Sequence, residues 1–392
     1  MIHVRLELVT ELLFWACVAG LVYAYAIYPI AIWVCARLFG SPSTAPAEAS
    51  EGDLPTVSVL IAAYNEQAVI GERVENALKL DYPASKLEIV IASDGSSDQT
   101  NSIIKTYSDP RVRLLEYPVR QGKASVLNAA FRELKGDIVV LSDANTNTDQ
   151  AAVRKLVRWF QSPDVGVVCG RLVLTDPATG NNVDSLYWKY ETFLKICESQ
   201  VGALLGANGA IYAIRRNLYA GIRRNTLIDD FVIPLLTRLR TGCSIEYDAE
   251  AVAYEETPEA MGSEFKRRAR IGTGGFQSLP VLWTLLNPMR GWISFTYFSH
   301  KIARWLCPFF LIGAFVSSVA LMSHHPYDFL LAAQVALYIV AGMGTRLKRP
   351  GIPSKCLRLA TLFAGMNLAL LVGFWRWVTS EPQGVWTRTA RQ

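Results

Sequence analysis

Near the N-terminus the chain carries no charge from Leu12 to Ala36, and this apolar run leaves it few ways to fold. A membrane-spanning helix needs about 20 consecutive apolar residues, and this run is longer. The run also exceeds the apolar core of about 7–15 residues that a cleaved signal peptide has, and Arg37 comes next. We therefore predict a retained membrane anchor over residues 1–40. Residues 41–55, rich in Pro, Ser, Ala and Glu, then form a linker.

Three more uncharged apolar runs lie near the C-terminus, at Trp305–Met322, Phe329–Thr345 and Leu359–Trp375. Each is close to the shortest length that spans a bilayer. A single run of this kind could be a buried core helix, but three in succession with Trp and Arg at their edges favour membrane helices. We predict about three spans within residues 305–379 and a tail over residues 380–392.

The charges of the connecting loops predict the topology. The loop at residues 346–358 is basic, whereas Ser323–Pro326 is nearly uncharged, so the first should be cytoplasmic and the second external. The middle of the chain then faces the cytoplasm from a multi-pass position in the cell (inner) membrane. The tail would lie outside despite Arg376, Arg388 and Arg391, a conflict that disappears only if one short segment is re-entrant or interfacial.

The middle region, residues 56–275, alternates apolar strands with segments of helical spacing. Strands are predicted at Val57–Ala62, Leu87–Ala92 and Ile138–Leu141, with helices between them. This alternation is typical of an α/β domain with a mainly parallel sheet. Residues 276–304 mix aromatic and basic residues, which predicts helices that lie in the bilayer interface.

Cysteine and histidine are poorly placed for catalysis or metal binding. The seven cysteines form no C-x-x-C pair, which argues against a zinc site or a disulfide framework. The four histidines all lie outside residues 56–275: His3, His300, His324 and His325. Carboxylates must therefore carry any acid–base or metal chemistry of the middle region.

Three short acidic clusters in the middle region supply such carboxylates: Ser93–Asp98, Ser142–Asn145 and Asp229–Asp230. The first two directly follow predicted strands. Carboxylates at the carboxyl ends of parallel strands point into the crevice where α/β sheets bind ligands. They suit a divalent cation and a phosphorylated ligand, and the downstream pair can supply a base.

The wider motifs, in chain order, are Ala62-Ala63-Tyr64-Asn65-Glu66, Ser93-Asp94-Gly95-Ser96, Arg120-Gln121-Gly122-Lys123, Ser142-Asp143-Ala144-Asn145 and Leu227-Ile228-Asp229-Asp230-Phe231. In this order and spacing they resemble the motifs of family 2 glycosyltransferases, which use nucleotide-diphosphate sugars and have a GT-A fold. Because apolar spans flank the motifs, the chain is most similar to membrane-bound polysaccharide synthases, such as the hyaluronan, chitin and poly-N-acetylglucosamine synthases.

The resemblance implies a donor site at the first strand ends. Residues implied to contact the donor nucleotide or its diphosphate are Tyr64, Asn65, Glu66, Asp94 and Lys123. From the residues alone, Asp94 also fits a turn or a helix cap, and Lys123 also fits a solvated lysine at a helix end. For Asp98 we favour the capping role.

The resemblance also implies a metal site and a base. Asp143 would bind Mg²⁺ or Mn²⁺, and Asn145 stands where the family has the second Asp of Asp-x-Asp, so it would offer a neutral carbonyl oxygen. Asp230 would be the catalytic base of an inverting displacement. The alternative, acids that stabilise a helix N-terminus, fits Asp229 well.

Acceptor and diphosphate contacts are implied further downstream. The small residues around Asn208 would line the acceptor site, unless they only form a tight turn. The family signature Gln-x-x-Arg-Trp corresponds to Arg267–Ile271, where Arg270 matches but Arg267 and Ile271 replace Gln and Trp. Arg267, Arg270 and, more weakly, Gln277 would contact the leaving diphosphate or the acceptor. A basic patch for anionic lipid is the alternative.

Together these features predict a membrane-bound inverting glycosyltransferase that moves sugar from a UDP-sugar to a growing cell-surface or extracellular polysaccharide. The expected partners are the donor, the acceptor and the bilayer, with no nucleic acid. One alternative is the transfer of a single sugar to a lipid-linked acceptor. The other is a non-catalytic membrane scaffold with a degenerate sugar-nucleotide site.

Overall fold

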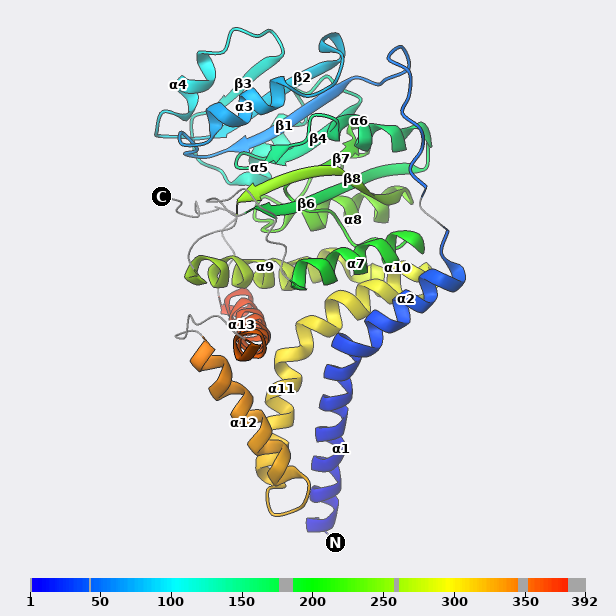
Figure 1. The fold of residues 1–392 in the computed structure, drawn as a ribbon, viewed down its shortest axis with the longest axis vertical. Coiled ribbons are helices and arrows are strands. Elements are labelled where there is room, and N and C mark those ends of the chain that lie inside the picture. The colour runs from blue at the N-terminus through cyan, green and yellow to red at the C-terminus, as the bar shows by residue number, and fades with distance from the viewer. Residues whose placement is uncertain (1, 42–43, 176–185, 257–260, 345–351, 380–392) are drawn as a thin grey trace. The chain divides into compact units, whose positions relative to one another are not determined.

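The computed structural model describes residues 2–41, 44–175, 186–256, 261–344 and 352–379. The chain divides into two compact units (Figure 1). The helical unit comprises Met1–Ala31, Ala260–Gln277 and Tyr297–Glu381. The described part of the sheet unit lies within Ile32–Glu259 and Ser278–Thr296. Residues 346–351 of the predicted basic loop and the tail from residue 380 lie outside the described residues.

The sheet unit is built on one sheet of eight strands in the order β3-β2-β1-β4-β7-β6-β8-β5. The strands are β1 (Val57–Ala63), β2 (Leu87–Asp94), β3 (Val112–Tyr117), β4 (Ile138–Asp143), β5 (Asn147–Thr148), β6 (Val165–Thr175), β7 (Tyr212–Arg215) and β8 (Ser244–Glu256). The predicted α/β fold with a mainly parallel sheet is confirmed. Two strands depart from the parallel arrangement: β7 pairs antiparallel with both β4 and β6, and β5 pairs antiparallel with β8.

The register of the parallel strands brings the first two acidic clusters together. Strand β1 pairs in parallel with β2 on one side and β4 on the other. Ala62 is opposite both Ala92 and Asp143. The carboxyl ends of β1, β2 and β4 therefore meet at one edge of the sheet, where such folds bind ligands.

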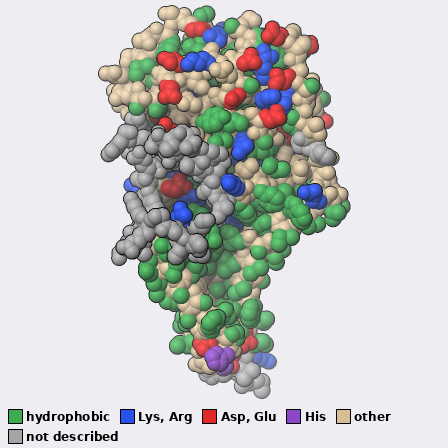
Figure 2. Space-filling view, viewed as in Figure 1, with side chains coloured by type: hydrophobic (Ala, Val, Ile, Leu, Met, Phe, Trp, Pro, Cys, Tyr) green, Lys and Arg blue, Asp and Glu red, His purple; other side chains and the backbone are tan. Residues whose placement is uncertain are grey.

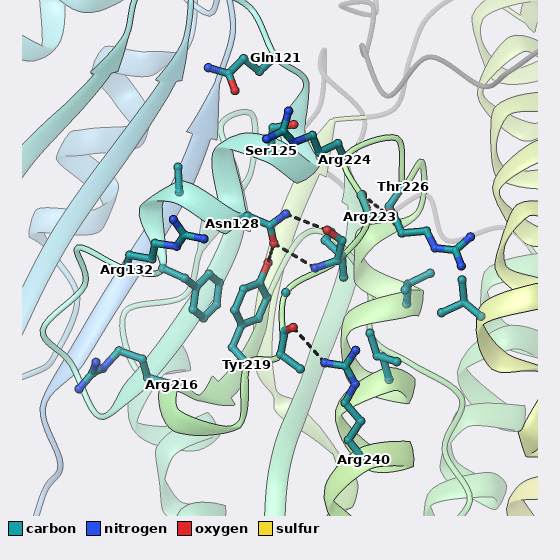
Figure 3. A pocket seen from close by; sticks show the side chains of 18 of the residues that line it. Gln121, Ser125, Asn128, Arg132, Arg216, Tyr219, Arg223, Arg224, Thr226 and Arg240 are labelled. Atoms are coloured by element: carbon teal, nitrogen blue, oxygen red, sulfur yellow. Dashed lines mark hydrogen bonds between the residues drawn. The ribbon is translucent and has the colours of Figure 1, made fainter.

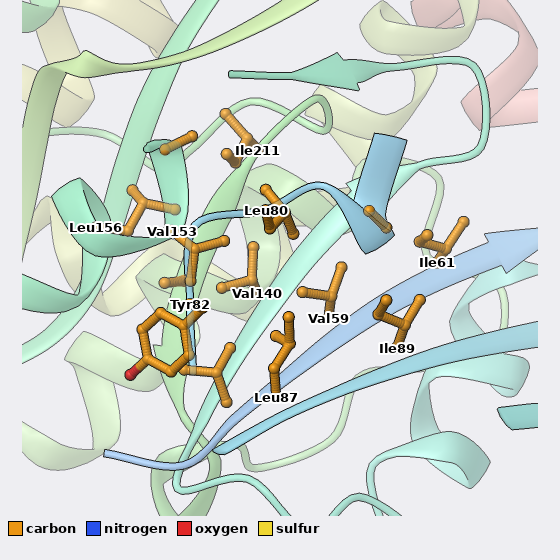
Figure 4. Close-up of a cluster of buried hydrophobic side chains, with 14 of the residues drawn as sticks. Val59, Ile61, Leu80, Tyr82, Leu87, Ile89, Val140, Val153, Leu156 and Ile211 are labelled. Carbon is orange, nitrogen blue, oxygen red and sulfur yellow. The ribbon is translucent and has the colours of Figure 1, made fainter. Parts of the chain in front are cut away.

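The main core lies on one face of this sheet. Alternate residues of β1, including Val59 and Ile61, pack in a buried cluster with helices α3 (Ile70–Leu78) and α6 (Ala152–Val157) (Figure 4). Helix α5 (Lys123–Ala130) contacts β1 and β2 but contributes no residue to that cluster, so it covers the other face. The edge with the strand ends is thus held between two helical layers.

The remaining helices of the sheet unit are short except for α7 and α8. They are α4 (Thr100–Lys105), α7 (Leu186–Gln200), α8 (Asp229–Thr241) and α10 (Trp292–Thr296). Helix α9 (Met261–Leu282) runs from the helical unit into the sheet unit. Helix α8 begins with the third acidic cluster and ends at Gly242, whose φ of 77° suits only glycine comfortably.

Among the described residues, four helical stretches are long and apolar enough to cross a membrane: Arg5–Phe39, Trp292–Ala320, Tyr327–Gly344 and Leu357–Thr379. They are built from α1 (Ile2–Val22), α2 (Tyr28–Phe39), α10, α11 (Ala303–Ala320), α12 (Tyr327–Gly344) and α13 (Ile352–Thr379), with π-helical turns at Tyr23–Ile27 and Tyr297–Ile302. One N-terminal and three C-terminal candidate spans were predicted. The second stretch starts inside the segment predicted to be interfacial, because the helix continues through the π-helical turn.

Small residues allow the helices of the helical unit to pack closely. A β-carbon on Gly20 of α1 would lie 2.6 Å from the Phe310 ring of α11, and one on Gly313 of α11 would lie 2.6 Å from Cys17 Sγ of α1. Glycine at such contacts is typical of membrane helix pairs, where van der Waals packing holds helices together. Figure 2 shows mainly hydrophobic side chains over this unit on the face in view.

Candidate active site

The loops after β1 and β2 are tied together by hydrogen bonds at the ligand-binding edge. Asn65 Oδ1 accepts a 2.8 Å hydrogen bond from the Ser97 backbone N–H. Asn65 has a φ of 54°, a left-handed conformation that asparagine tolerates better than most residues. The Glu66 N–H donates to Thr100 Oγ1 over 2.8 Å. Three of the predicted donor residues, Tyr64 included, therefore lie on a braced loop.

Tyr64 also has a cationic neighbour. The Arg120 guanidinium carbon lies 3.7 Å above the centre of the Tyr64 ring, which is a cation–π contact. A flat aromatic and guanidinium pair at the strand ends is a surface on which a nucleobase can stack.

Asp94, at the end of β2, is fully buried and holds the segment that precedes α5. Its two carboxylate oxygens accept hydrogen bonds from the backbone N–H groups of Gln121, over 2.7 Å, and Gly122, over 2.9 Å. Because Lys123 is the next residue, Asp94 fixes where Lys123 begins the helix. Asp98 Oδ1 accepts a 3.0 Å hydrogen bond from the N–H of Thr100, the first residue of α4, although the N-cap position itself is occupied by Gln99.

Lys123 joins the second and third acidic clusters. Its Nζ lies 2.8 Å from Asp143 Oδ1 and 3.1 Å from Asp229 Oδ2. Burial acts to lower the pKa of Lys123, but the charges of Asp143 and Asp229 outweigh it, so the pKa is raised. A lysine so placed stays charged at neutral pH and can transfer its contacts to an anionic ligand.

Asp230 lies beside this cluster at the start of α8. A β-carbon on Gly209 would lie 2.9 Å from Asp143 Oδ2 and 3.7 Å from Asp230 Oδ2, so the two carboxylates meet across one glycine. The backbone fixes this approach, because the Ala207 N–H donates to the Asp230 carbonyl oxygen over 2.9 Å. Burial raises the pKa of Asp230, and the charge of Asp229 raises it further. A carboxylate with a raised pKa is a stronger base.

Asn145 and Asn208 are both anchored. Asn145 Nδ2 donates to Glu255 Oε1 of β8 over 2.9 Å. Asn208 Nδ2 donates to the Gly170 carbonyl oxygen over 2.7 Å, and its Oδ1 accepts from the Ile211 N–H over 3.2 Å. The amide of Asn208 therefore holds the turn before β7, which gives the small-residue stretch its shape.

Arg267, Arg270 and Gln277 lie on the part of α9 that belongs to the helical unit, whereas every other predicted site residue lies in the sheet unit. Arg267 Nη1 is 3.6 Å from Glu264 Oε2, one turn earlier on the helix.

Three polar residues of the site had no signal in the sequence. The charge of Lys195, on α7, acts to lower the pKa of Asp230. Arg73, on α3, is almost fully buried and donates from Nε to the Asp143 carbonyl oxygen over 3.4 Å. Burial raises the pKa of Tyr212 on β7, as do the nearby acids, so its hydroxyl stays protonated.

The donor set fits a divalent cation that is shared with a ligand. Asp143 is about one-third exposed at the strand end. Among the described residues no three His, Cys, Asp or Glu side chains group together as metal ligands. Mg²⁺ commonly binds through one or two carboxylates plus substrate phosphates and water, and this site offers one such carboxylate. A metal held entirely by protein ligands does not fit.

The sequence of this region matches a known family. Residues 58–219 match the model of glycosyl transferase family 2. A β-monoglucosyldiacylglycerol synthase of Synechocystis is 26% identical over 68% of this chain and 58% of its own length. The probable glycosyltransferase YdaM of Bacillus subtilis is 26% identical over 71% and 69%. A poly-β-1,6-N-acetyl-D-glucosamine synthase of Staphylococcus aureus is 27% identical over 58% and 56%. The chain thus spans little more than half the length of two of these relatives.

The fold also has a solved counterpart. A mannosyltransferase of Pyrobaculum calidifontis, solved with GDP-Man and Mn²⁺, superposes with a TM-score of 0.71 at 22% identity, over 94% of this chain and 99% of that one. The described fold is therefore that of a GT-A glycosyltransferase with additional apolar helices.

Proposed function

Because this chain is a glycosyltransferase whose residues 58–219 form a family 2 domain, we propose that it transfers sugar from a UDP-sugar to an acceptor hydroxyl with inversion. The single observation that carries the proposal is the meeting of Asp143 and Asp230 across Gly209. It puts a carboxylate suited to the donor side beside a partly buried carboxylate suited to a base. The transferase domain in this proposal comprises residues 56–275.

Asp230 acts as the base. It takes the proton of an acceptor hydroxyl while that oxygen forms a bond to the anomeric carbon of the donor. The bond from this carbon to the diphosphate oxygen breaks, and UDP leaves with the electron pair. One base without a nucleophilic partner gives a single displacement and hence inversion. The raised pKa of Asp230 supports this role.

The donor lies over the strand ends. In this proposal Tyr64 and Asp94 hold the nucleobase and ribose, and Lys123 contacts the diphosphate. Asp143 would hold a Mg²⁺ or Mn²⁺ ion, which would neutralise charge on the departing diphosphate. Asn145 orients the same strand end through Glu255. Arg267, Arg270 and Gln277 complete the diphosphate and acceptor contacts in this proposal.

The acceptor is a growing polysaccharide in this proposal, and the chain is a multi-pass protein of the cell membrane with its transferase domain in the cytoplasm. Four candidate spans support the membrane position. The Staphylococcus aureus relative, named as a polysaccharide synthase, supports the acceptor class.

A lipid-linked acceptor that receives one sugar is the second candidate, favoured by Ile271 in place of Trp and by the Synechocystis relative named for a glycolipid.

The test is transfer from radiolabelled donors by membranes that contain the full chain. UDP-sugars are compared with GDP-mannose, with Mn²⁺, Mg²⁺ or a chelator present, and the products are sized and extracted with organic solvent. A large water-soluble product made only from a UDP-sugar supports the main proposal. A single-sugar product in the organic phase rejects the polysaccharide acceptor, and turnover of GDP-mannose alone rejects the UDP donor. Equal inactivity of wild type and Asp230→Asn over the panel rejects both.

A further inference from the structure

A second concave site lies in the sheet unit and takes no part in the proposed transfer. It is a groove of about 910 Å³. Helix α5, the segment at residues 216–226 and one side of α8 form its walls (Figure 3). Phe131 and Tyr219 line it as a stacked pair, with ring centres 3.6 Å apart and planes 9° apart. Asn128 braces one wall, because its Oδ1 accepts from the Tyr219 hydroxyl over 2.7 Å and from the Ile222 N–H over 3.0 Å.

The groove is strongly and uniformly basic. Five exposed arginines line it: Arg132, Arg216, Arg223, Arg224 and Arg240. No Asp or Glu is among its described lining residues. Within the described chain none of the five pairs with a carboxylate, and Arg216 and Arg240 instead donate to the backbone carbonyl oxygens of Gly136 and Ala220. Five like charges that share one braced groove repel one another, so an anion is the complementary ligand.

The chemistry of arginine narrows the anion to a phosphate. Guanidinium groups bind phosphate oxygens in pairs of parallel hydrogen bonds, and several can surround one phosphate ester. The donor diphosphate is not that ligand in the proposed site, because the diphosphate is assigned to Lys123 and Asp143, which are not among the described residues that line the groove. Arg240 is ten residues along α8 from Asp230, which at 1.5 Å per residue is about 15 Å away.

The surroundings of the groove indicate a lipid headgroup. Pro280 and Val281 line it, and the chain continues from them within the sheet unit into Trp283, which is 65% exposed, and Met289, which is 90% exposed. Exposed Trp and Met beside arginines are typical of protein surfaces that enter the membrane interface. A headgroup in the groove would leave its acyl chains beside this apolar segment.

We propose that the groove lined by the five arginines is a binding site for the phosphate headgroup of an anionic phospholipid. The site anchors the sheet unit to the cytoplasmic leaflet in the proposed topology, and its role is separate from sugar transfer. Arginines that bind a phosphate headgroup would also bind free inorganic phosphate, so the experiment compares the affinity of the groove for these two ligands.

The experiment titrates the detergent-solubilised full chain with dioctanoyl phosphatidylglycerol, dioctanoyl phosphatidylcholine and inorganic phosphate. We expect the first to bind at least about tenfold tighter than the other two. In the double variant Arg223→Gln/Arg224→Gln, the affinity for dioctanoyl phosphatidylglycerol should fall about tenfold or more. Each basic residue near an anionic lipid surface raises the binding affinity by several-fold. The control Lys79→Gln/Lys135→Gln removes two exposed charges outside the groove and should stay within about twofold of wild type.

Each other outcome overturns the proposal. Equal affinity for the two lipids, or unchanged binding in the groove variant, rejects the headgroup site. Full displacement of the lipid by equimolar inorganic phosphate rejects the lipid as the source. Unfolding temperatures establish that the variants are folded. If the double variant is not, Arg132→Gln carries the same test with a loss of about fivefold. Because these are binding measurements, failure leaves the proposed sugar transfer untouched.

Discussion

Lys123 Nζ lies 2.8 Å from Asp143 Oδ1, so the cation at the start of α5 neutralises the carboxylate at the end of β4. A second contact of 3.1 Å joins the same lysine to Asp229 at the start of α8. Elements more than 100 residues apart in the chain are thus linked by one side chain. Binding a metal–diphosphate donor would replace the first contact, because Asp143 would turn to the cation and Lys123 to a phosphate oxygen.

Lys123→Met should raise the KM for the donor by about 10- to 100-fold, since a hydrogen bond between charged groups contributes about 1.5–3 kcal/mol. The measurement is transfer rate against UDP-sugar concentration. Lys86→Met is the matched control, because Lys86 is also held by several partners, the backbone carbonyls of Glu51, Gly52 and Leu54, but lies outside the site. A donor KM that changes equally in both variants would assign Lys123 a purely structural role.

Asp230→Asn should lower kcat by about 10²- to 10⁴-fold, the usual contribution of a positioned general base, because an amide cannot take the acceptor proton. Affinity for UDP should change little, since Asp230 makes no proposed nucleotide contact. Calorimetric titration of UDP and single-turnover transfer measure the two quantities. Weakened UDP binding with an unchanged single-turnover rate would contradict the assignment.

The same Asp230→Asn substitution should make the protein more stable at neutral pH. Burial raises the pKa of Asp230 above its unfolded value, so the ionised form costs folding free energy. In the wild type, the contribution of Asp230 to the free energy of unfolding is fully present below the unfolded pKa of about 3.9. It is lost as the pH rises through the pKa of Asp230 in the folded protein. The gain in unfolding temperature should therefore be present at pH 7 and vanish toward pH 4. A gain that is the same at both values would point to another cause.

The parts of the site that follow strands were predictable from the sequence. Asp94 and Asp143 each end an apolar run, and parallel pairing dictates that such ends meet. The antiparallel strand β7 was harder to predict, because four residues, Tyr212–Arg215, carry too little pattern to give a direction. Its insertion between β4 and β6 is what brings Gly209 against Asp143.

Contacts between distant segments could not be predicted at all. The pairing of Asn145 with Glu255, and the action of Lys195 on Asp230, depend on how β8 and α7 pack, which no local pattern encodes. The same holds for Asp94, whose hydrogen bonds to the backbone of Gln121 and Gly122 are a positioning role that its motif did not indicate.

Lys195→Gln should move the acid limb of the pH–rate profile to higher pH. Transfer needs ionised Asp230, so the rate falls as the pH drops through the pKa of Asp230. The charge of Lys195 lowers that pKa, and its removal lets the pKa rise. Lys189→Gln, an exposed lysine on the same helix, is the control and should leave the limb in place. The profile of kcat/KM is the measurement, and a shift to lower pH would contradict the geometry.

Gly209→Ala should weaken the affinity of the site for the divalent cation without unfolding the protein. The added methyl would lie 2.9 Å from Asp143 Oδ2, closer than such contacts occur, so the carboxylate must rotate away from the position in which it would bind the ion. Displaced support for a metal ligand typically costs about 10- to 100-fold in affinity, so the Mn²⁺ concentration for half-maximal activity should rise by a similar factor.

Gly71→Ala on α3 is the matched control for Gly209→Ala, because its added methyl meets only ordinary contacts, the nearest 3.6 Å away at the Tyr107 hydroxyl. It should leave the Mn²⁺ requirement unchanged and stabilise the helix by about 0.5–1 kcal/mol. Both variants are titrated with Mn²⁺ at saturating donor. An unaltered Mn²⁺ requirement in Gly209→Ala would remove Asp143 from the proposed metal site, since the methyl cannot be placed without moving that carboxylate.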